Sequence, residues 1–331
     1  MDLLLTFDYE LYFGSPTGSV ERCMIKPTEA LERIAERHRI PLVFFVDIGF
    51  LIRLERELEK HPSLQGDYRN ICDQLNRLAK SGHELQLHIH PHWEDSRFDG
   101  EQWICDVSRY KLADFPAENI RQIITTYCKR LQKFAGLGKI QAFRAGGWCV
   151  QPFDRMAEAL AEVGIKIDSS VFPGGHYQSR EYDYDFRDAP DQTRWKFNLD
   201  PLLEDENGLF TEIPISSRTE SPYFYWKLFL LGRLKPKYYR PIGDGNPMPA
   251  PGYRKKLLTQ YTTQPVSVDG YNAVRLGAAL SQHEKQNAQQ LVVIGHPKAL
   301  SPFSLDAIER FIEEQKHKHR FCGYNTILSS S

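Results

Sequence analysis

Residues 82–93 read Gly-His-Glu-Leu-Gln-Leu-His-Ile-His-Pro-His-Trp, and the interpretation of the fold starts from this stretch. It holds four of the chain's eleven histidines within ten residues. Its first half alternates apolar and polar positions, which predicts a strand over 84–90 that ends before Pro91. Neutral imidazole is a good ligand for Zn, Ni, Co and Fe, so this density of histidine at a strand end predicts a divalent metal site.

Apolar runs of strand length alternate with amphipathic helical patterns over most of the chain. We predict strands at 2–7, 41–47, 84–90, 139–144, 164–168, 208–214 and 291–295. We predict helices at 27–38, 66–81, 117–134, 152–162, 272–286 and 303–317, the last with Ser304 as its N-cap. Repeated βα units at both ends of the chain predict one α/β barrel-like domain over 1–331, with a long insertion at 217–262 before the last strand.

The composition is that of a globular protein with a sizeable core, since 41% of the 331 residues are hydrophobic and 26% are charged. A net charge of −1 gives no electrostatic reason to expect nucleic acid as a partner. The six cysteines are dispersed without a CxxC pair, so neither a disulfide framework nor a thiolate zinc site is indicated. No leader-peptide pattern and no bilayer-spanning apolar run occur in the sequence, and we expect a cytoplasmic protein.

Polar or glycine-rich segments stand at five predicted strand ends, where βα barrels place their catalytic residues. They are TFDYE at 6–10, the histidine cluster, FRAGGW at 143–148, DSS at 168–170 and GHP at 295–297. One such ending would mean little, because Asp and Gly are common where strands end. Five together indicate a functional site.

These five segments, in this order, resemble the five motifs of the polysaccharide deacetylase superfamily, also called the NodB-homology or carbohydrate esterase family 4 superfamily. The resemblance extends from residue 6 to residue 297 and leaves out the insertion. It implies a distorted (β/α) barrel and metal-dependent hydrolysis of an N-acetyl or related acyl group on a sugar. In character the chain is closest to cytoplasmic bacterial members associated with lipopolysaccharide or capsule assembly. The expected substrate is therefore an acylated sugar of a surface polysaccharide or its precursor, linked to a lipid or a nucleotide.

The metal ligands implied by the resemblance include His88 and His92, which match the family's H-x-x-x-H pair. Two imidazoles four residues apart can converge on one ion if the chain turns helically after the strand. His90 is the rival ligand, because an extended backbone points His88 and His90 to the same side. Zinc is the expected ion, with cobalt, nickel and manganese as alternatives.

The carboxylates at the end of the first strand depart from the family pattern of two adjacent Asp residues, because Tyr9 stands in the second place. Glu10 lies two residues from Asp8, so an extended chain points both carboxylates to one side. We assign Asp8 as general base and Glu10 as third metal ligand, and the reverse assignment stays open. Arg144 is expected to keep Asp8 ionised.

The remaining roles concern the leaving group and the oxyanion. His296 is expected to protonate the leaving amine, because an amide nitrogen is expelled poorly as an anion. Asp168 is the candidate to orient His296. An amide at Gly147 is expected to stabilise the oxyanion, with Trp148 as an apolar wall, although the family's usual Pro and aromatic residue are replaced here.

The insertion contains the aromatic run YFYWKLFLL at 223–231, followed by basic residues at Arg233, Lys235, Lys237 and Arg240. Aromatic side chains stack on sugars, and Trp226 is the expected substrate contact. An apolar run with basic neighbours can also rest on an anionic membrane surface as a peripheral contact. An ordinary buried helix is the alternative.

Three other functions fit parts of the pattern. A deformylase or another C–N hydrolase would use the same site, and a non-catalytic relative would bind metal and sugar alone. Two His and one carboxylate also describe the non-haem iron oxygenases, but the alternation of strands and helices argues against their usual all-β fold.

Overall fold

The computed structural model describes residues 1–136, 138–234 and 236–329, so Lys235 of the predicted basic run lies outside the described residues. One large sheet forms the centre, in the order β10-β11-β7-β6-β3-β2-β1-β14, with β15 pairing with the start of β1. All neighbours in it are parallel except β10 and β11. Its strands are β1 (Asp2–Tyr9), β2 (Val43–Asp47), β3 (Glu84–Ile89), β6 (Ala142–Ala145), β7 (Ile167–Asp168), β10 (Trp195–Phe197), β11 (Phe210–Glu212), β14 (Gln290–Gly295) and β15 (Arg320–Phe321).

The sheet curls, and irregular backbone bridges the gap between β11 and β14. The N–H of Ser216, just past β11, donates to Val292 O at 3.0 Å, and Ser216 Oγ accepts from the Val292 N–H at 3.0 Å. Val266 continues the bridge: its N–H donates to Ser216 O at 2.6 Å, and its carbonyl accepts from the Ile294 N–H at 3.0 Å. The fold is thus a curled, mostly parallel half-barrel, which confirms the predicted distorted α/β barrel.

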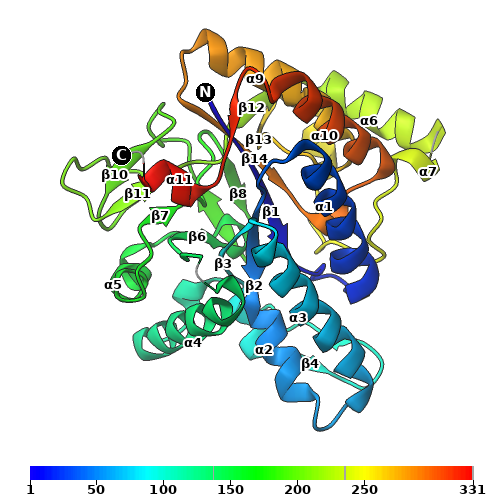
Figure 1. Ribbon diagram of the computed structural model, residues 1–331, viewed down its shortest axis with the longest axis vertical. Helices are drawn as coiled ribbons and strands as arrows, with labels where there is room; N and C mark the ends of the chain where they lie inside the picture. The colour runs from blue at the N-terminus through cyan, green and yellow to red at the C-terminus, as the bar shows by residue number, and fades with distance from the viewer. Residues whose placement is uncertain (137, 235, 330–331) are drawn as a thin grey trace.

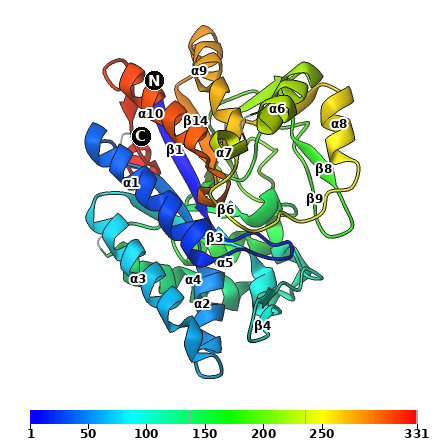
Figure 2. The same cartoon turned by 90° about the vertical axis from the view of Figure 1, so that its right-hand side faces the viewer.

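Helices cover the outside of the half-barrel (Figures 1 and 2). They are amphipathic, as in α4, where Ile120, Ile124 and Tyr127 recur at helical spacing and are buried. The last long helix begins earlier than predicted: its N-cap is Ser301, whose side chain accepts from the Ser304 N–H. The helices are α1 (Lys26–His38), α2 (Ile48–Glu57), α3 (Gln65–Lys80), α4 (Ala117–Ala135), α5 (Asp154–Glu162), α9 (Leu276–Lys285), α10 (Pro302–Gln315) and α11 (Tyr324–Ser329).

The predicted insertion leaves the barrel on β12 (Ser217–Glu220) and returns on its antiparallel partner β13 (Thr262–Pro265). Between these strands lie α6 (Pro222–Leu234), α7 (Pro236–Tyr239) and α8 (Tyr253–Thr259), of which α6 and α8 appear at the upper right of Figure 2. Two small hairpins complete the structure: β4 (Arg97–Phe98) with β5 (Trp103–Ile104), and β8 (His176–Gln178) with β9 (Asp183–Asp185). Among the described helices, none combines the length and apolar character needed to cross a bilayer.

Candidate active site

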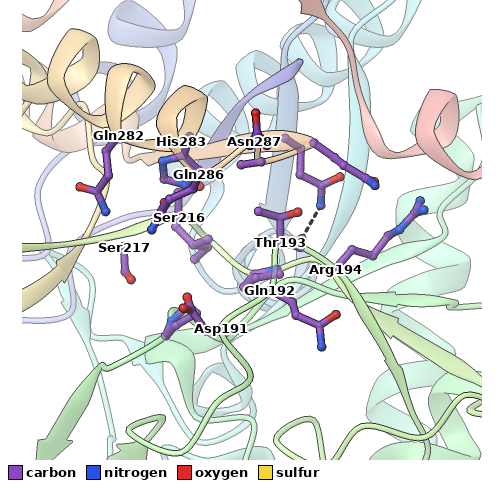
Figure 3. Close-up of a pocket in the computed structure, with 16 residues that line it drawn as sticks. Asp191, Gln192, Thr193, Arg194, Ser216, Ser217, Gln282, His283, Gln286 and Asn287 are labelled. Atoms are coloured by element: carbon purple, nitrogen blue, oxygen red, sulfur yellow. Dashed lines mark hydrogen bonds between the residues drawn. The ribbon is translucent and has the colours of Figure 1, made fainter.

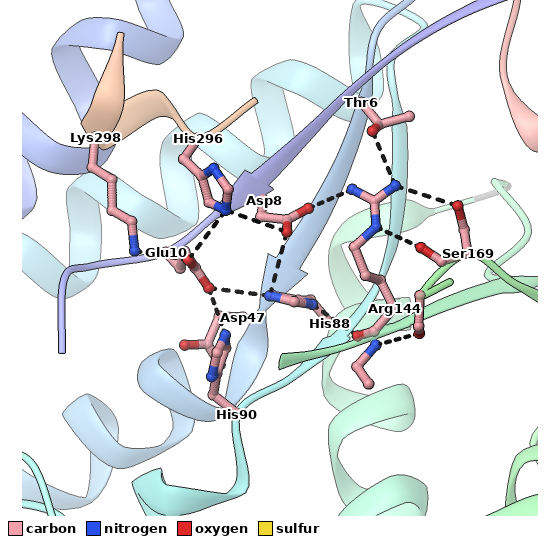
Figure 4. A network of polar contacts seen from close by, with 12 residues as sticks. Thr6, Asp8, Glu10, Asp47, His88, His90, Arg144, Ser169, His296 and Lys298 are labelled. Carbon is pink, nitrogen blue, oxygen red and sulfur yellow. Dashed lines mark hydrogen bonds and ion pairs between the residues drawn. The ribbon is translucent and has the colours of Figure 1, made fainter. Parts of the chain in front are cut away.

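The polar strand ends meet at one end of the curled sheet. The register places Asp47, His88 and Arg144 in one row across β2, β3 and β6. β1 contributes Asp8, and His296 directly follows β14 on the other side of β1. Figure 4 shows these side chains pointing toward one another.

Asp8 is anchored by Arg144, whose side chain is completely buried. Arg144 Nη1 donates to Asp8 Oδ1 at 2.6 Å, while Nη2 donates to Thr6 Oγ1 at 3.0 Å and Nε to the Ser169 carbonyl at 2.9 Å. The two buried charges compensate each other, and the saturated guanidinium fixes the carboxylate in one orientation. Asp8 and Arg144 are therefore in direct contact, as predicted.

Glu10, His88 and His90 bring one ligand atom each to within 4.8 Å of the others. Glu10 Oε2 lies 3.1 Å from His88 Nε2 and 2.7 Å from His90 Nε2. His88 Nδ1 donates to the Arg144 carbonyl at 2.8 Å, so Nε2 is the nitrogen that faces Glu10. Two imidazoles, of which His88 is oriented through its second nitrogen, and one carboxylate fit a divalent ion such as zinc and leave coordination positions open for water and substrate.

The electrostatics of this group also suit a metal. Burial opposes a charge on Glu10, but Lys298 and the two histidines hold the pKa of its carboxyl well below the usual value. Burial lowers the pKa of His90 to about 4. For His88, burial lowers the pKa, but Asp8 and Glu10 outweigh it and the pKa is raised. Glu10 and His90 are thus in the protonation states that metal binding needs, whereas His88 would give up its proton when an ion binds.

His92 lies outside this group of converging ligand atoms. The backbone of His90 is extended, and the chain turns helically only from Pro91. The His92 ring stacks on Tyr110, with ring centroids 5.7 Å apart, and both of its buried nitrogens lack a hydrogen-bond partner among the described residues. The structure thus brings together His88 and His90, the alternative that extended backbone favours, rather than the motif pair His88 and His92.

His296 lies between two carboxylates. Its Nδ1–H donates to Asp269 Oδ2 at 2.8 Å, and its backbone N–H donates to Asp269 Oδ1 at 2.8 Å. Its Nε2 faces Asp8 Oδ2 at 3.6 Å and Glu10 Oε1 at 3.8 Å. Burial lowers the pKa of His296, but Asp269 outweighs burial and raises it to about 9. His296 can therefore carry a proton at neutral pH.

The structure corrects the prediction that Asp168 orients His296. Asp168 instead accepts hydrogen bonds from the hydroxyl of Ser170 at 2.7 Å and from its N–H at 3.2 Å. The orienting carboxylate, Asp269, was missed. Its signal in the sequence is an Asp-Gly pair after the alternating segment 265–268, which runs beside β14 through a bond from the Val268 N–H to Ile294 O at 2.9 Å.

The predicted oxyanion segment forms a tight turn, Gly146–Trp148, directly after β6. A Cβ on Gly146 would lie 2.5 Å from His90 Nδ1, so only glycine lets the turn pack against that imidazole. Gly147 has a φ of 60°, and a Cβ there would lie 2.7 Å from the Tyr110 ring. The role of the Gly147 amide stays a prediction.

A pocket of about 240 Å³ opens beside His296. Trp148 lines it, and its role as an apolar wall for the substrate stays a prediction. Trp226 does not: it is 59% exposed and its indole N–H donates to Leu258 O at 3.1 Å. The insertion side chains that do line the pocket are Tyr225, Leu228 and Phe229 from α6 and Tyr253 and Leu257 from α8.

Two further buried charges were missed in the sequence. Lys298, two residues after His296, donates from Nζ to Glu10 Oε1 at 2.7 Å and to the Leu11 carbonyl. Asp47 ends β2 and accepts from the Trp93 indole N–H at 2.6 Å, and burial raises its pKa to about 7. Asp47 had a signal, since it ends a strand as the other site residues do, but nothing marked Lys298.

A larger hollow of about 600 Å³ lies away from these strand ends, between the 191–194 loop and the end of α9 (Figure 3). Amides and hydroxyls dominate its lining, including Gln192, Ser217 and Gln286. The metal-ligating cluster found among the described residues is not there, so we place the chemistry at the strand ends rather than in this hollow.

No protein-family model matches the sequence, and no curated protein matches it either. Solved structures do match. A protein from Mycobacterium smegmatis that carries the provisional name polysaccharide deacetylase aligns with 99% of this chain and 89% of its own, at 15% identity and a TM-score of 0.54. The Puue allantoinase aligns over 98% of this chain and 88% of its own, at 13% identity and a TM-score of 0.50.

The 4-alpha-glucanotransferase from Thermococcus litoralis also matches, at 14% identity and a TM-score of 0.50, and this chain spans 38% of its length. At such identities the likeness concerns the fold alone. The chain therefore has a fold similar to that of a polysaccharide deacetylase, with a buried His/Glu group suited to a metal at the end of its sheet.

Proposed function

We propose that this protein is a metal-dependent hydrolase that removes an N-acyl group, in the first instance N-acetyl, from a sugar of a bacterial surface polysaccharide or its precursor. One observation carries the proposal: the ligand atoms of Glu10, His88 and His90 converge beside Asp8 and His296, whose Oδ2 and Nε2 lie 3.6 Å apart. We assign these two residues as base and acid. The sequence motifs and the similar fold support it.

The residues present fit a divalent ion. Glu10 Oε2 and the Nε2 atoms of His88 and His90 would hold it, and zinc suits this donor set. A bound ion would polarise the acyl carbonyl and acidify water. Lys298 holds the other oxygen of Glu10 and so turns Oε2 toward the imidazoles.

The protein side chains would then move the protons. Asp8, held by Arg144 through Oδ1, has Oδ2 available to take the proton of the attacking water. His296 carries a proton on Nε2 while Asp269 holds Nδ1, so it can protonate the nitrogen of the leaving amine. The pocket that Trp148 lines lies beside His296 and could hold a part of the substrate next to this pair.

Metal content and amine release test this proposal together. In His90→Ala the bound metal, measured by plasma mass spectrometry, should fall well below one equivalent, whereas His92→Ala is the matched control that keeps it. Asp8→Asn should keep the metal and lose about 10²–10⁴-fold in the rate of amine release from N-acetylated sugars.

Two results would overturn the proposed function or its ligand set. Loss of metal in His92→Ala with retention in His90→Ala would reverse the ligand set. Failure of the metal-loaded protein to release amine from any of a panel of N-acetylated and N-formylated sugars would refute the hydrolase itself.

A further inference from the structure

The helix α6 is apolar on two opposite sides. Phe224 and Tyr225 are buried against the body of the protein. Tyr223, Trp226 and Leu230 are 76%, 59% and 56% exposed, and Leu234 adds a fourth at 67%. These four positions are spaced by three and four residues, so they form one continuous stripe along the helix. A helix that is apolar all round normally has both sides covered.

Basic side chains surround this stripe. Residues 222–256 contain eight Lys and Arg and one acidic residue, Asp244, in a chain whose net charge is −1. Lys227 and Arg233 flank the stripe on α6 and are exposed. Neither forms an ion pair with any residue that the structure describes, and the same holds for Lys237 and Lys255. The exposed basic residues beside the stripe thus form a positively charged patch on a nearly neutral protein.

The helix α8 extends the same patch. The indole of Trp226 donates to Leu258 O at 3.1 Å, and the Arg254 guanidinium lies 4.3 Å from the centre of the Phe229 ring. These contacts hold α6 and α8 side by side, as Figure 2 also shows. We refer to the exposed stripe of α6 with the basic residues of α6 and α8 as the α6–α8 face.

Charge decides which occupant fits this face. In a symmetric dimer the same patch would meet itself, and the basic residues of the two copies would repel. An anionic lipid surface complements both the basic residues and the apolar stripe of this face. Its headgroup phosphates attract Lys and Arg, and the boundary of its acyl chains accepts Tyr, Trp and Leu. Tyr and Trp are also the residues that favour this interfacial depth.

We propose that the α6–α8 face docks on an anionic phospholipid membrane, and that the acylated sugar is carried by a lipid anchored in it. The second part rests on the proposed function. The side of α6 that faces away from the stripe lines the pocket beside His296 through Leu228 and Phe229, so one helix connects the membrane to the reacting group. A lipid-linked sugar would enter along this helix.

Vesicle co-sedimentation of the full chain tests the docking without any need for catalysis. We expect binding to phosphatidylcholine vesicles that contain about one-quarter phosphatidylglycerol, and little binding to phosphatidylcholine alone. Raising the salt from about 0.1 to about 0.5 M should weaken the binding, because the attraction to the surface is screened.

Two double variants separate the charges from the stripe. Lys227→Glu with Arg233→Glu, and separately Leu230→Ser with Leu234→Ser, should each lower the affinity for the anionic vesicles at least about tenfold. All four side chains are exposed, so the melting temperature should be unchanged. The rate of amine release from a water-soluble N-acetylated sugar should also stay the same, which keeps the docking test apart from the test of the hydrolase.

Matched controls come from elsewhere on the surface. Lys129→Glu with Lys133→Glu changes the same charge on α4, which lies far from α6 in both views (Figures 1 and 2). Leu203→Ser with Leu209→Ser removes two leucines that are 67% and 75% exposed. Both controls should bind vesicles as the unmodified protein does. Equal binding to neutral and anionic vesicles, loss of binding in the controls, or a concentration-dependent dimer that the α6 variants abolish would each overturn the proposal.

Discussion

His296 is held by Asp269 from one side and faces Asp8 and Glu10 on the other. Asp269 accepts both the side-chain Nδ1–H and the backbone N–H of His296, so it fixes the position and the tautomer of the imidazole. Burial lowers the pKa of His296, but this carboxylate, the largest of the raising contributions, together with Asp8 and Glu10 raises it to about 9. Asp269 is therefore a positioning residue for the proposed acid.

The pH profile of amine release should report this contact. The acid form of His296 is present below its pKa and is lost as the pH rises through it. Asp269→Asn keeps the shape but removes the charge, so the basic limb of kcat/KM should move down by about 1–2 pH units toward the ordinary histidine value. Asp168→Asn is the matched control and should leave the basic limb in place. If the limb moved with Asp168→Asn instead, the original assignment of Asp168 would return.

Local chemistry explains which site residues the sequence could identify. Asp8 and Glu10 lie on one strand, and a period of two is enough to place them together. His88 and His90 follow the same rule, although the family motif favoured His92. Asp269 belongs to a loop that comes next to His296 only in the folded barrel. The pattern of neighbouring residues in the sequence therefore could not predict this contact.

At the scale of elements, β7 and β11 place two carboxyl groups side by side in the interior. Asp168 and Glu212 are paired in register and are both almost completely buried. Burial and the neighbouring Asp168 raise the pKa of Glu212 well above its usual value. The folded protein thus holds a proton on Glu212 that the unfolded chain releases.

This proton makes stability depend on pH. The folded pKa of Glu212 is raised, so stability falls as the pH rises above the unfolded value of about 4.3, by up to about 1.4 kcal/mol per pH unit until the folded carboxyl ionises. Glu212→Gln cannot ionise, and its free energy of unfolding relative to the unmodified protein should therefore increase from pH 5 to pH 8 in urea titrations. Glu206→Gln, at an exposed position, should show no such trend. A difference that does not change with pH would contradict the buried proton.

The helices and strands that the sequence identified are those with long amphipathic or apolar patterns, such as β1, β3 and α4. The helix α2 was missed because it begins directly after β2, with Asp47 as both the last strand residue and the N-cap. The short strands β10 and β15 were missed because two or three residues carry no readable period. Such strands form because a neighbouring strand edge is already in place.

For the whole molecule, α6 determines how the barrel end is reached. One side of this helix faces the pocket beside His296 and the other faces outward. The pocket has a volume of about 240 Å³, below the roughly 300–1,000 Å³ of sites that enclose a drug-sized ligand. It therefore accommodates only a part of the substrate, and its apolar lining favours an apolar group attached to the sugar.

Phe229→Ala should separate two kinds of substrate. The ring lines the pocket, and its loss removes about 1–1.5 kcal/mol of contact with an apolar aglycone, which corresponds to a rise of about 5–12-fold in KM for an N-acetylated alkyl or aryl glycoside. The KM for the free N-acetylated monosaccharide should change little, because that substrate does not reach the ring. Tyr223→Ala is the matched control: Tyr223 lies on the same helix, is 76% exposed and does not line the pocket, so both KM values should stay the same. If Phe229→Ala changed both substrates alike, or Tyr223→Ala reproduced its effect, the pocket would not be the site that selects the apolar group.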